Sequence, residues 1–77
     1  MAEIKVTWED RAKRFLKAEL KRAGVGYREL AERLEKHGLQ ETEASIANKL
    51  ARGKFAATFF LASLAEIGCE IVRLEDV

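Results

Sequence analysis

The sequence contains no proline, and it has one cysteine (Cys69) and one histidine (His37) in 77 residues. A single cysteine excludes an internal disulfide, and one cysteine with one distant histidine lacks the spacing of a zinc site. The absence of proline favours uninterrupted helices. No apolar run approaches the roughly 20 residues that span a bilayer. We therefore expect no metal or other cofactor and no membrane association.

The sequence also has little that could support catalysis. His37 has no recognisable nucleophile or carboxylate partner, and residues 24–26 (GVG) lack the third glycine and the preceding strand of a nucleotide-binding loop. The first residues, MAEIK, have neither the basic start nor the apolar stretch of a signal peptide. We expect a cytoplasmic protein that is not an enzyme, has no evident small-molecule substrate and acts by binding a partner.

The length predicts one domain over residues 1–77, and the 48% hydrophobic and 35% charged residues are typical of a globular chain. The formal net charge is only +1, but it is unevenly distributed. Residues 11–54 carry an excess of +6, whereas residues 1–10 carry −2 and residues 55–77 carry −3. A basic middle suits a surface that binds a polyanion, and it equally suits an ordinary solvated surface. Charge alone leaves both interpretations open.

Hydrophobic periodicity predicts a first helix over residues 8–23 and a second from Tyr27 to about Gly38. An apolar stripe runs along the first helix and consists of Trp8, Ala12, Phe15, Leu16, Leu20 and Ala23. Thr7 is a candidate N-cap, and Gly24 is a natural C-terminal stop. We expect Trp8 and Tyr27 to pack in the core or at helix ends.

A third helix is predicted between a Thr42 cap and Gly53, with Ile46, Ala47 and Leu50 facing inward. Residues 55–65 carry no charge and should form most of a fourth helix that ends at Gly68. A helix that is apolar on all sides is typical of complete burial. In so small a chain, another molecule could supply part of that burial.

Two segments have the pattern of short strands. Residues 3–8 alternate polar and apolar side chains, with Ile4, Val6 and Trp8 on one side, and residues 69–74 are rich in β-forming residues. The two strands could pair with each other, either within one chain or between two chains.

Two stretches resemble the lambda-repressor and Cro type of helix-turn-helix domain. These are GVGYRELAERL at residues 24–34 and SIANKLARGK at residues 45–54, and LAEIG at residues 64–68 is similar to the later core helix of that family. The resemblance implies a mainly α fold, a four-helix lambda-repressor-like domain with short terminal β-strands. It also implies a small bacterial transcriptional regulator that binds double-stranded DNA sequence-specifically as a homodimer. From residue 8 to residue 74 the chain also resembles a bacterial domain family of unknown function.

The candidate base-reading residues lie at i, i+3, i+4 and i+7 of the third helix, and therefore on one face: Ser45, Asn48, Lys49 and Arg52. Asparagine can read adenine, and arginine or lysine can read guanine, through paired hydrogen bonds. The candidate phosphate contacts are Gly26, Tyr27 and Arg28 at the start of the second helix, and Lys54 beyond the third. Any exposed helix face is polar, however, so a plain solvated face remains the alternative.

A second class of function is a protein-interaction module that keeps this fold without binding DNA. It is favoured by the low net charge and by the connection at residues 37–41, which is longer than the three to four residues usual in DNA-binding versions. A homodimer is expected because the chain lies near the lower size limit for independent stability, because its fourth helix has no charged face, and because both termini have strand patterns.

Overall fold

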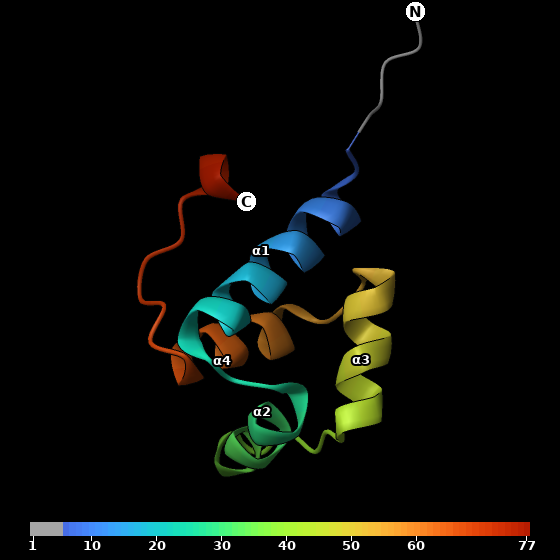
Figure 1. Ribbon diagram of the computed structural model, residues 1–77, viewed down its shortest axis with the longest axis vertical. Coiled ribbons are helices and arrows are strands. Elements are labelled where there is room, and N and C mark those ends of the chain that lie inside the picture. The colour runs from blue at the N-terminus through green and yellow to red at the C-terminus, as the bar shows by residue number, and fades with distance from the viewer. Residues whose placement is uncertain (1–5) are drawn as a thin grey trace, which may run out of the picture.

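A computed structural model describes residues 6–77, which form four α-helices and two short 3-10 helices (Figure 1). The α-helices are α1 (Trp8–Ala23), α2 (Tyr27–Leu34), α3 (Glu43–Arg52) and α4 (Ala57–Glu66), and the 3-10 helices are η1 (Glu35–His37) and η2 (Leu74–Asp76). Residues 6–77 contain no strand. The expected mainly helical fold with four α-helices is confirmed.

Helices α1 and α3 have the ends that the sequence predicted. Thr7 and Thr42 each accept a hydrogen bond from the backbone N–H three residues later, at 3.1 and 3.0 Å. Gly24 and Gly53 end the two helices in the left-handed conformation, with φ of 71° and 70°. These caps satisfy backbone groups that a helix leaves unpaired at its ends, which is why they locate the boundaries well.

The other two helices are shorter than predicted. Helix α2 ends at Leu34, and η1 continues the predicted segment as far as Gly38, which has φ of 79°. Helix α4 begins only at Ala57 and has no side-chain cap.

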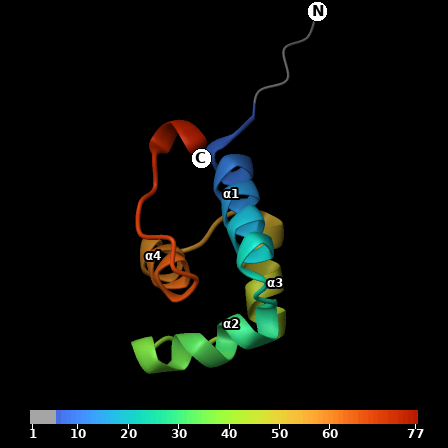
Figure 2. The ribbon, with the colours of Figure 1, turned by 60° about the vertical axis from the view of Figure 1, so that its left-hand side comes forward.

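The core gathers apolar side chains from all four helices. Helix α2 packs against α3 and α4, and α1 packs against the same two helices (Figures 1 and 2). The buried hydrophobic residues are Leu16, Leu20, Val25, Leu30, Ala31, Leu34, Ile46, Leu50, Phe59 and Leu64. Burial of these side chains supplies the main driving force for folding.

Helix α4, whose only charged residue is Glu66 at its end, is buried on one side only. Phe59, Ser63 and Leu64 face the core, whereas the Leu61 side chain is 62% exposed. The Ser63 hydroxyl is buried without a hydrogen-bond partner among the described residues. Residues 6–77 therefore do not cover the whole of α4.

The predicted C-terminal strand at residues 69–74 is wrong. Residues 69–73 belong to no helix or strand, and Leu74 begins η2. A β-rich segment becomes a strand only if another strand accepts its backbone hydrogen bonds, and residues 6–77 offer none. The predicted N-terminal strand lies partly outside the described residues. Its last residues, Val6 and Thr7, are in coil, and Trp8 is already helical.

Three residues assigned to apolar faces are exposed: Trp8 and Ala23 of the predicted stripe on α1, and Ala47 on α3. Trp8 is 61% exposed, and its ring lies 3.9 Å from the Arg11 guanidinium, because the first turn of α1 extends past the core. Ala47 is exposed on α3, where Ile46 and Leu50 alone are buried. Helix α3 therefore buries only a narrow stripe.

A cluster of polar contacts joins α2 and η1 to the end of α4. The Glu66 carboxylate lies 3.1 Å from Lys36 Nζ and 2.6 Å from His37 Nε2, and the Glu66 carbonyl accepts a hydrogen bond from Arg33. The hydrogen bond with His37, together with Lys36, outweighs desolvation and holds the pKa of the Glu66 carboxyl below its ordinary value.

Candidate nucleic-acid interface

The outer face of α3 brings together all four residues predicted to read bases. They line one shallow hollow of about 330 Å³, together with one predicted phosphate contact from beyond the helix: Ser45, Asn48, Lys49, Arg52 and Lys54. The helical spacing places the first four on one face, and the left-handed turn at Gly53 carries Lys54 back to them.

This orientation of α3 follows from its buried side. Ile46 and Leu50 have no exposed surface, and they lie one turn apart against the core. A rotation of α3 about its axis would expose these two side chains, at a cost of about 1.5–3 kcal/mol each. The polar face is therefore held outward by the packing of the apolar one.

Ser45 is engaged in holding the start of α3. Its hydroxyl oxygen accepts a hydrogen bond from the Thr42 backbone N–H at 2.8 Å and lies 2.7 Å from Glu41 Oε1. With the reciprocal bond from the Ser45 N–H to Thr42, these contacts form a capping box. Ser45 therefore lies in the hollow but has its hydroxyl occupied.

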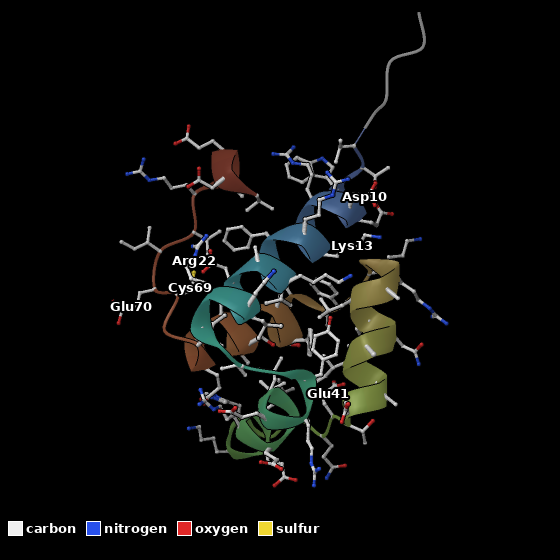
Figure 3. All side chains as sticks on the ribbon, viewed as in Figure 1. Asp10, Lys13, Arg22, Glu41, Cys69 and Glu70 are labelled. Carbon is white, nitrogen blue, oxygen red and sulfur yellow. The ribbon has the colours of Figure 1, made fainter. Side chains whose placement is uncertain are left out.

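The Lys49 side chain is also held in place, by the Glu41 carboxylate. Its ammonium lies 3.1 Å from Glu41 Oε1 and 5.7 Å from the centre of the Phe59 ring. Glu41 is 89% buried at its side chain, between α2 and the start of α3 (Figure 3). Sequence reasoning missed Glu41, although an acidic residue directly before a capping threonine is a signal that could have pointed to it.

Asn48 and Arg52 differ from these two residues. Both are exposed, and no hydrogen bond or ion pair within the described part of the chain engages either side chain. One amide and one guanidinium, one helical turn apart, thus point their donors and acceptors into the hollow. These are the two side chains of α3 best able to recognise another molecule.

The end of α3 is fixed by an unusually close approach to α1. A Cβ atom on Gly53 would lie 2.3 Å from the Glu9 carbonyl oxygen, and the Lys13 ammonium lies 3.5 Å from the carbonyl of Ala51. Lys54 is 3.9 Å from a Glu9 carboxylate oxygen, but its side chain is largely exposed. The first turn of α1 therefore positions the cationic end of the hollow.

The remaining predicted phosphate contacts lie at the start of α2 and not in the hollow. Gly26 is the N-cap, with no side-chain hydrogen bond, and its carbonyl accepts the first helical bond from Leu30. Tyr27 is half-buried against the core, and Arg28 is exposed. The N–H groups of the first turn of α2 thus have no acceptor within the helix, which is the arrangement that suits an anion.

Within residues 6–77, no three His, Cys, Asp or Glu side chains come together as a metal site would require. None of the helices in this range has both the length and the apolar character needed to cross a membrane.

Comparison with known proteins gives one family. The family model described as "Domain of unknown function (DUF6471)" matches residues 8–72. No curated protein and no solved structure matches the chain significantly.

Proposed function

We propose a function from the geometry of the α3 face. The chain belongs to the DUF6471 family, a domain of unknown function, and this membership does not indicate an activity. The proposal is a helix-turn-helix domain of the lambda-repressor type that binds double-stranded DNA sequence-specifically. In this proposal the protein is a small transcriptional regulator, and α3 enters the major groove as a dimer reads two half-sites.

The observation that carries the proposal is the pair Asn48 and Arg52. Both side chains are exposed, and no hydrogen bond or ion pair within the described residues engages them. The rotation of their helix is set by the buried Ile46 and Leu50. An asparagine can pair with the N6 and N7 edge of adenine, and an arginine with O6 and N7 of guanine. The exposed alanines Ala44 and Ala51 flank this face and add little bulk, so the backbone of α3 can approach base edges closely.

The other residues of the hollow have supporting roles in this proposal. Lys54 is the exposed cation at the end of α3 and would contact a phosphate. Lys49 would add positive charge from its position beside Glu41, and Ser45 would hold the first turn of the helix through its cap. The free N–H groups at the start of α2, with Arg28, would contact a second phosphate.

The rival function is a protein-interaction module without DNA affinity. The connection between α2 and α3 favours it, because η1 and residues 38–42 make this connection longer than the three to four residues of DNA-binding helix-turn-helix units. The Glu41 carboxylate also offsets part of the positive charge of the α3 face.

Fluorescence anisotropy with genomic and random duplex DNA, at low and at physiological salt, tests the proposal. We expect the affinity for DNA to fall steeply as the salt concentration rises, because lysine and arginine side chains that contact phosphates displace counterions from the DNA. On a selected site, Asn48→Ala and Arg52→Ala should each remove about 1–3 kcal/mol of discrimination between the site and random DNA. Lys54→Ala should instead weaken binding to both DNAs alike and reduce the salt slope by about one.

Lys36→Ala is the matched control, since it also removes an exposed cation but lies on η1, outside the α3 hollow. If this variant lowers binding as much as Arg52→Ala does, the effect reflects total charge and the reader face is wrongly assigned. Absence of binding to any duplex at low salt would exclude the DNA-binding function and leave the interaction module.

A further inference from the structure

A second surface, on another side of the molecule, has no role in the α3 site. It lies between α1 and the C-terminal residues 69–77, which we call the tail, and it encloses a hollow of about 590 Å³. Phe15, Ala18, Cys69 and Ile71 contribute apolar walls. Four arginines also line it: Arg11, Arg14, Arg22 and Arg73. The ribbon shows the tail running alongside α1 and returning to its N-terminal end (Figures 1 and 2).

Large apolar side chains are concentrated around this hollow. Of the five large hydrophobic residues that are exposed in the described chain, Val6 and Ile71 line the hollow and Leu61 lies on α4. The other two, Trp8 and Leu74, contact Arg11, which itself lines the hollow. Ile71 is 80% exposed and Leu74 is 74% exposed, and nothing in residues 6–77 covers them. Clustered exposure of this kind marks an interaction surface.

Arg11 makes this surface a defined structure. Its guanidinium lies 3.9 Å from the centre of the Trp8 ring, and it donates hydrogen bonds to the Val77 carbonyl at 2.7 Å and the Leu74 carbonyl at 3.4 Å. One side chain thus holds the end of the tail beside the start of α1. The backbone that carries the exposed side chains around Arg11 is therefore held in a fixed place.

The two walls of the surface carry opposite charge. Arg14 on α1 and Asp76 on the tail are both exposed, and both line the hollow. The ion pairs found among residues 6–77 include neither of these two side chains, whereas Arg22 pairs with Glu19 on α1 and Arg73 pairs with Glu75 on the tail. Glu70 points outward, away from α1 (Figure 3). Each wall therefore has unmatched charge that the opposite wall of another copy could neutralise.

We propose that the α1–tail surface is the interface of a two-fold homodimer, in which the tail of each protomer lies against α1 of the other. A two-fold interface uses the same patch on both subunits, so the patch must complement itself. This one does so, because it combines apolar side chains with Arg14 on one wall and Asp76 on the other, and neither charge is paired within residues 6–77. A stable interface buries roughly 800 Å² of accessible surface on each partner. This area is about a seventh of the 5667 Å² accessible surface of the chain.

The position of this interface also fits the function proposed above, and the inference deepens that proposal by naming the partner surface of its dimer. The tail and α3 lie on different sides of α1 (Figures 1 and 2). Pairing through the tail would leave both α3 faces uncovered. Two copies of the α3 face could then contact two half-sites of one duplex.

Light scattering and sedimentation of the full chain, from micromolar to near-millimolar concentration and without DNA, test the interface. The wild type should have the mass of a dimer, and Ile71→Glu should have the mass of a monomer at concentrations where the wild type is dimeric. Because Ile71 is so exposed, this substitution should leave the helical circular dichroism spectrum unchanged. Leu61→Glu is the matched control: it places the same charge on the exposed apolar residue of α4 and should remain dimeric.

A wild type that is monomeric throughout this range overturns the inference. A dimer that survives Ile71→Glu also overturns it, and a dimer broken by Leu61→Glu alone moves the interface to α4. The outcome is independent of the DNA titration. A dimer that binds no DNA refutes only the proposed function, and a monomer that binds DNA refutes only the interface.

Discussion

Substitution of Gly53 by alanine tests how α3 is fixed against α1. Gly53 has φ of 70°, a conformation that costs a residue with a side chain roughly 1–2 kcal/mol. Its position adds a second cost, because the new Cβ would lie 2.3 Å from the carbonyl oxygen and 2.8 Å from the carbonyl carbon of Glu9. Both are backbone atoms, so no side-chain rotation can relieve the clash, and the end of α3 must move away from α1.

Overpacking of this kind typically costs a further 1–3 kcal/mol. We therefore expect Gly53→Ala to lower the free energy of unfolding by about 2–5 kcal/mol, a large part of the total for so small a domain. Gly24→Ala is the control, because Gly24 has φ of 71° but nothing within 4 Å of a Cβ atom. It should show the conformational cost alone.

Urea and thermal denaturation, followed by the circular dichroism of the helices, measure both variants. For a domain of this size each kcal/mol shifts the melting temperature by roughly 4–8 °C, so the two midpoints should be clearly separated. Equal destabilisation by Gly53→Ala and Gly24→Ala would refute the argument, since it would show that the approach of α3 to Glu9 contributes nothing.

Two further predictions concern α4. Ser63→Ala should raise the free energy of unfolding by roughly 1 kcal/mol in urea denaturation. The buried Ser63 hydroxyl has no partner in the described chain, and leaving such a group unsatisfied costs about 1–3 kcal/mol. A lower urea midpoint for the variant would show that the hydroxyl forms a hydrogen bond in solution. The lowered pKa of Glu66 means that its carboxylate stabilises the fold fully above the ordinary carboxyl pKa of about 4.3, and that this stability is lost as the pH falls through the lower folded value. Glu66→Gln, which keeps a polar side chain near Lys36 and His37, should therefore melt below the wild type at neutral pH and approach it near pH ~3, whereas a constant difference would contradict the assignment.

Much of the helical framework could be predicted from the sequence, because the signals involved are local. A threonine that bonds the backbone three residues on, and a glycine that adopts a left-handed turn, act within one turn of the helix that they cap. Thr7, Gly24, Thr42 and Gly53 were therefore found correctly. The spacing of Asn48 and Arg52 likewise follows from the helical repeat, so their shared face was predictable.

Other features required the tertiary structure because they depend on atoms distant in the chain. Residues 69–73 have strand-forming side chains, but a strand also needs a partner backbone, and the described fold supplies none. The periodicity of α1 placed Trp8 on the apolar stripe, although the core ends before that turn. Glu41 lies only four and eight residues before Ser45 and Lys49, and the structure adds that one carboxylate oxygen engages both side chains.

The sequence by itself determined where α1 and α3 begin and end and which of their leucine and isoleucine side chains are buried, because caps and apolar periodicity are local properties of the chain. The tertiary structure decided which of the four predicted reader residues are free to bind. The connection before α3 brings Glu41 to Ser45 and Lys49, whereas no hydrogen bond or ion pair within residues 6–77 engages Asn48 or Arg52. The tertiary structure likewise placed the tail beside α1, where the two form an exposed surface with both positive and negative side chains. The tail is not a strand because its backbone N–H and C=O groups find no partner strand in the described chain.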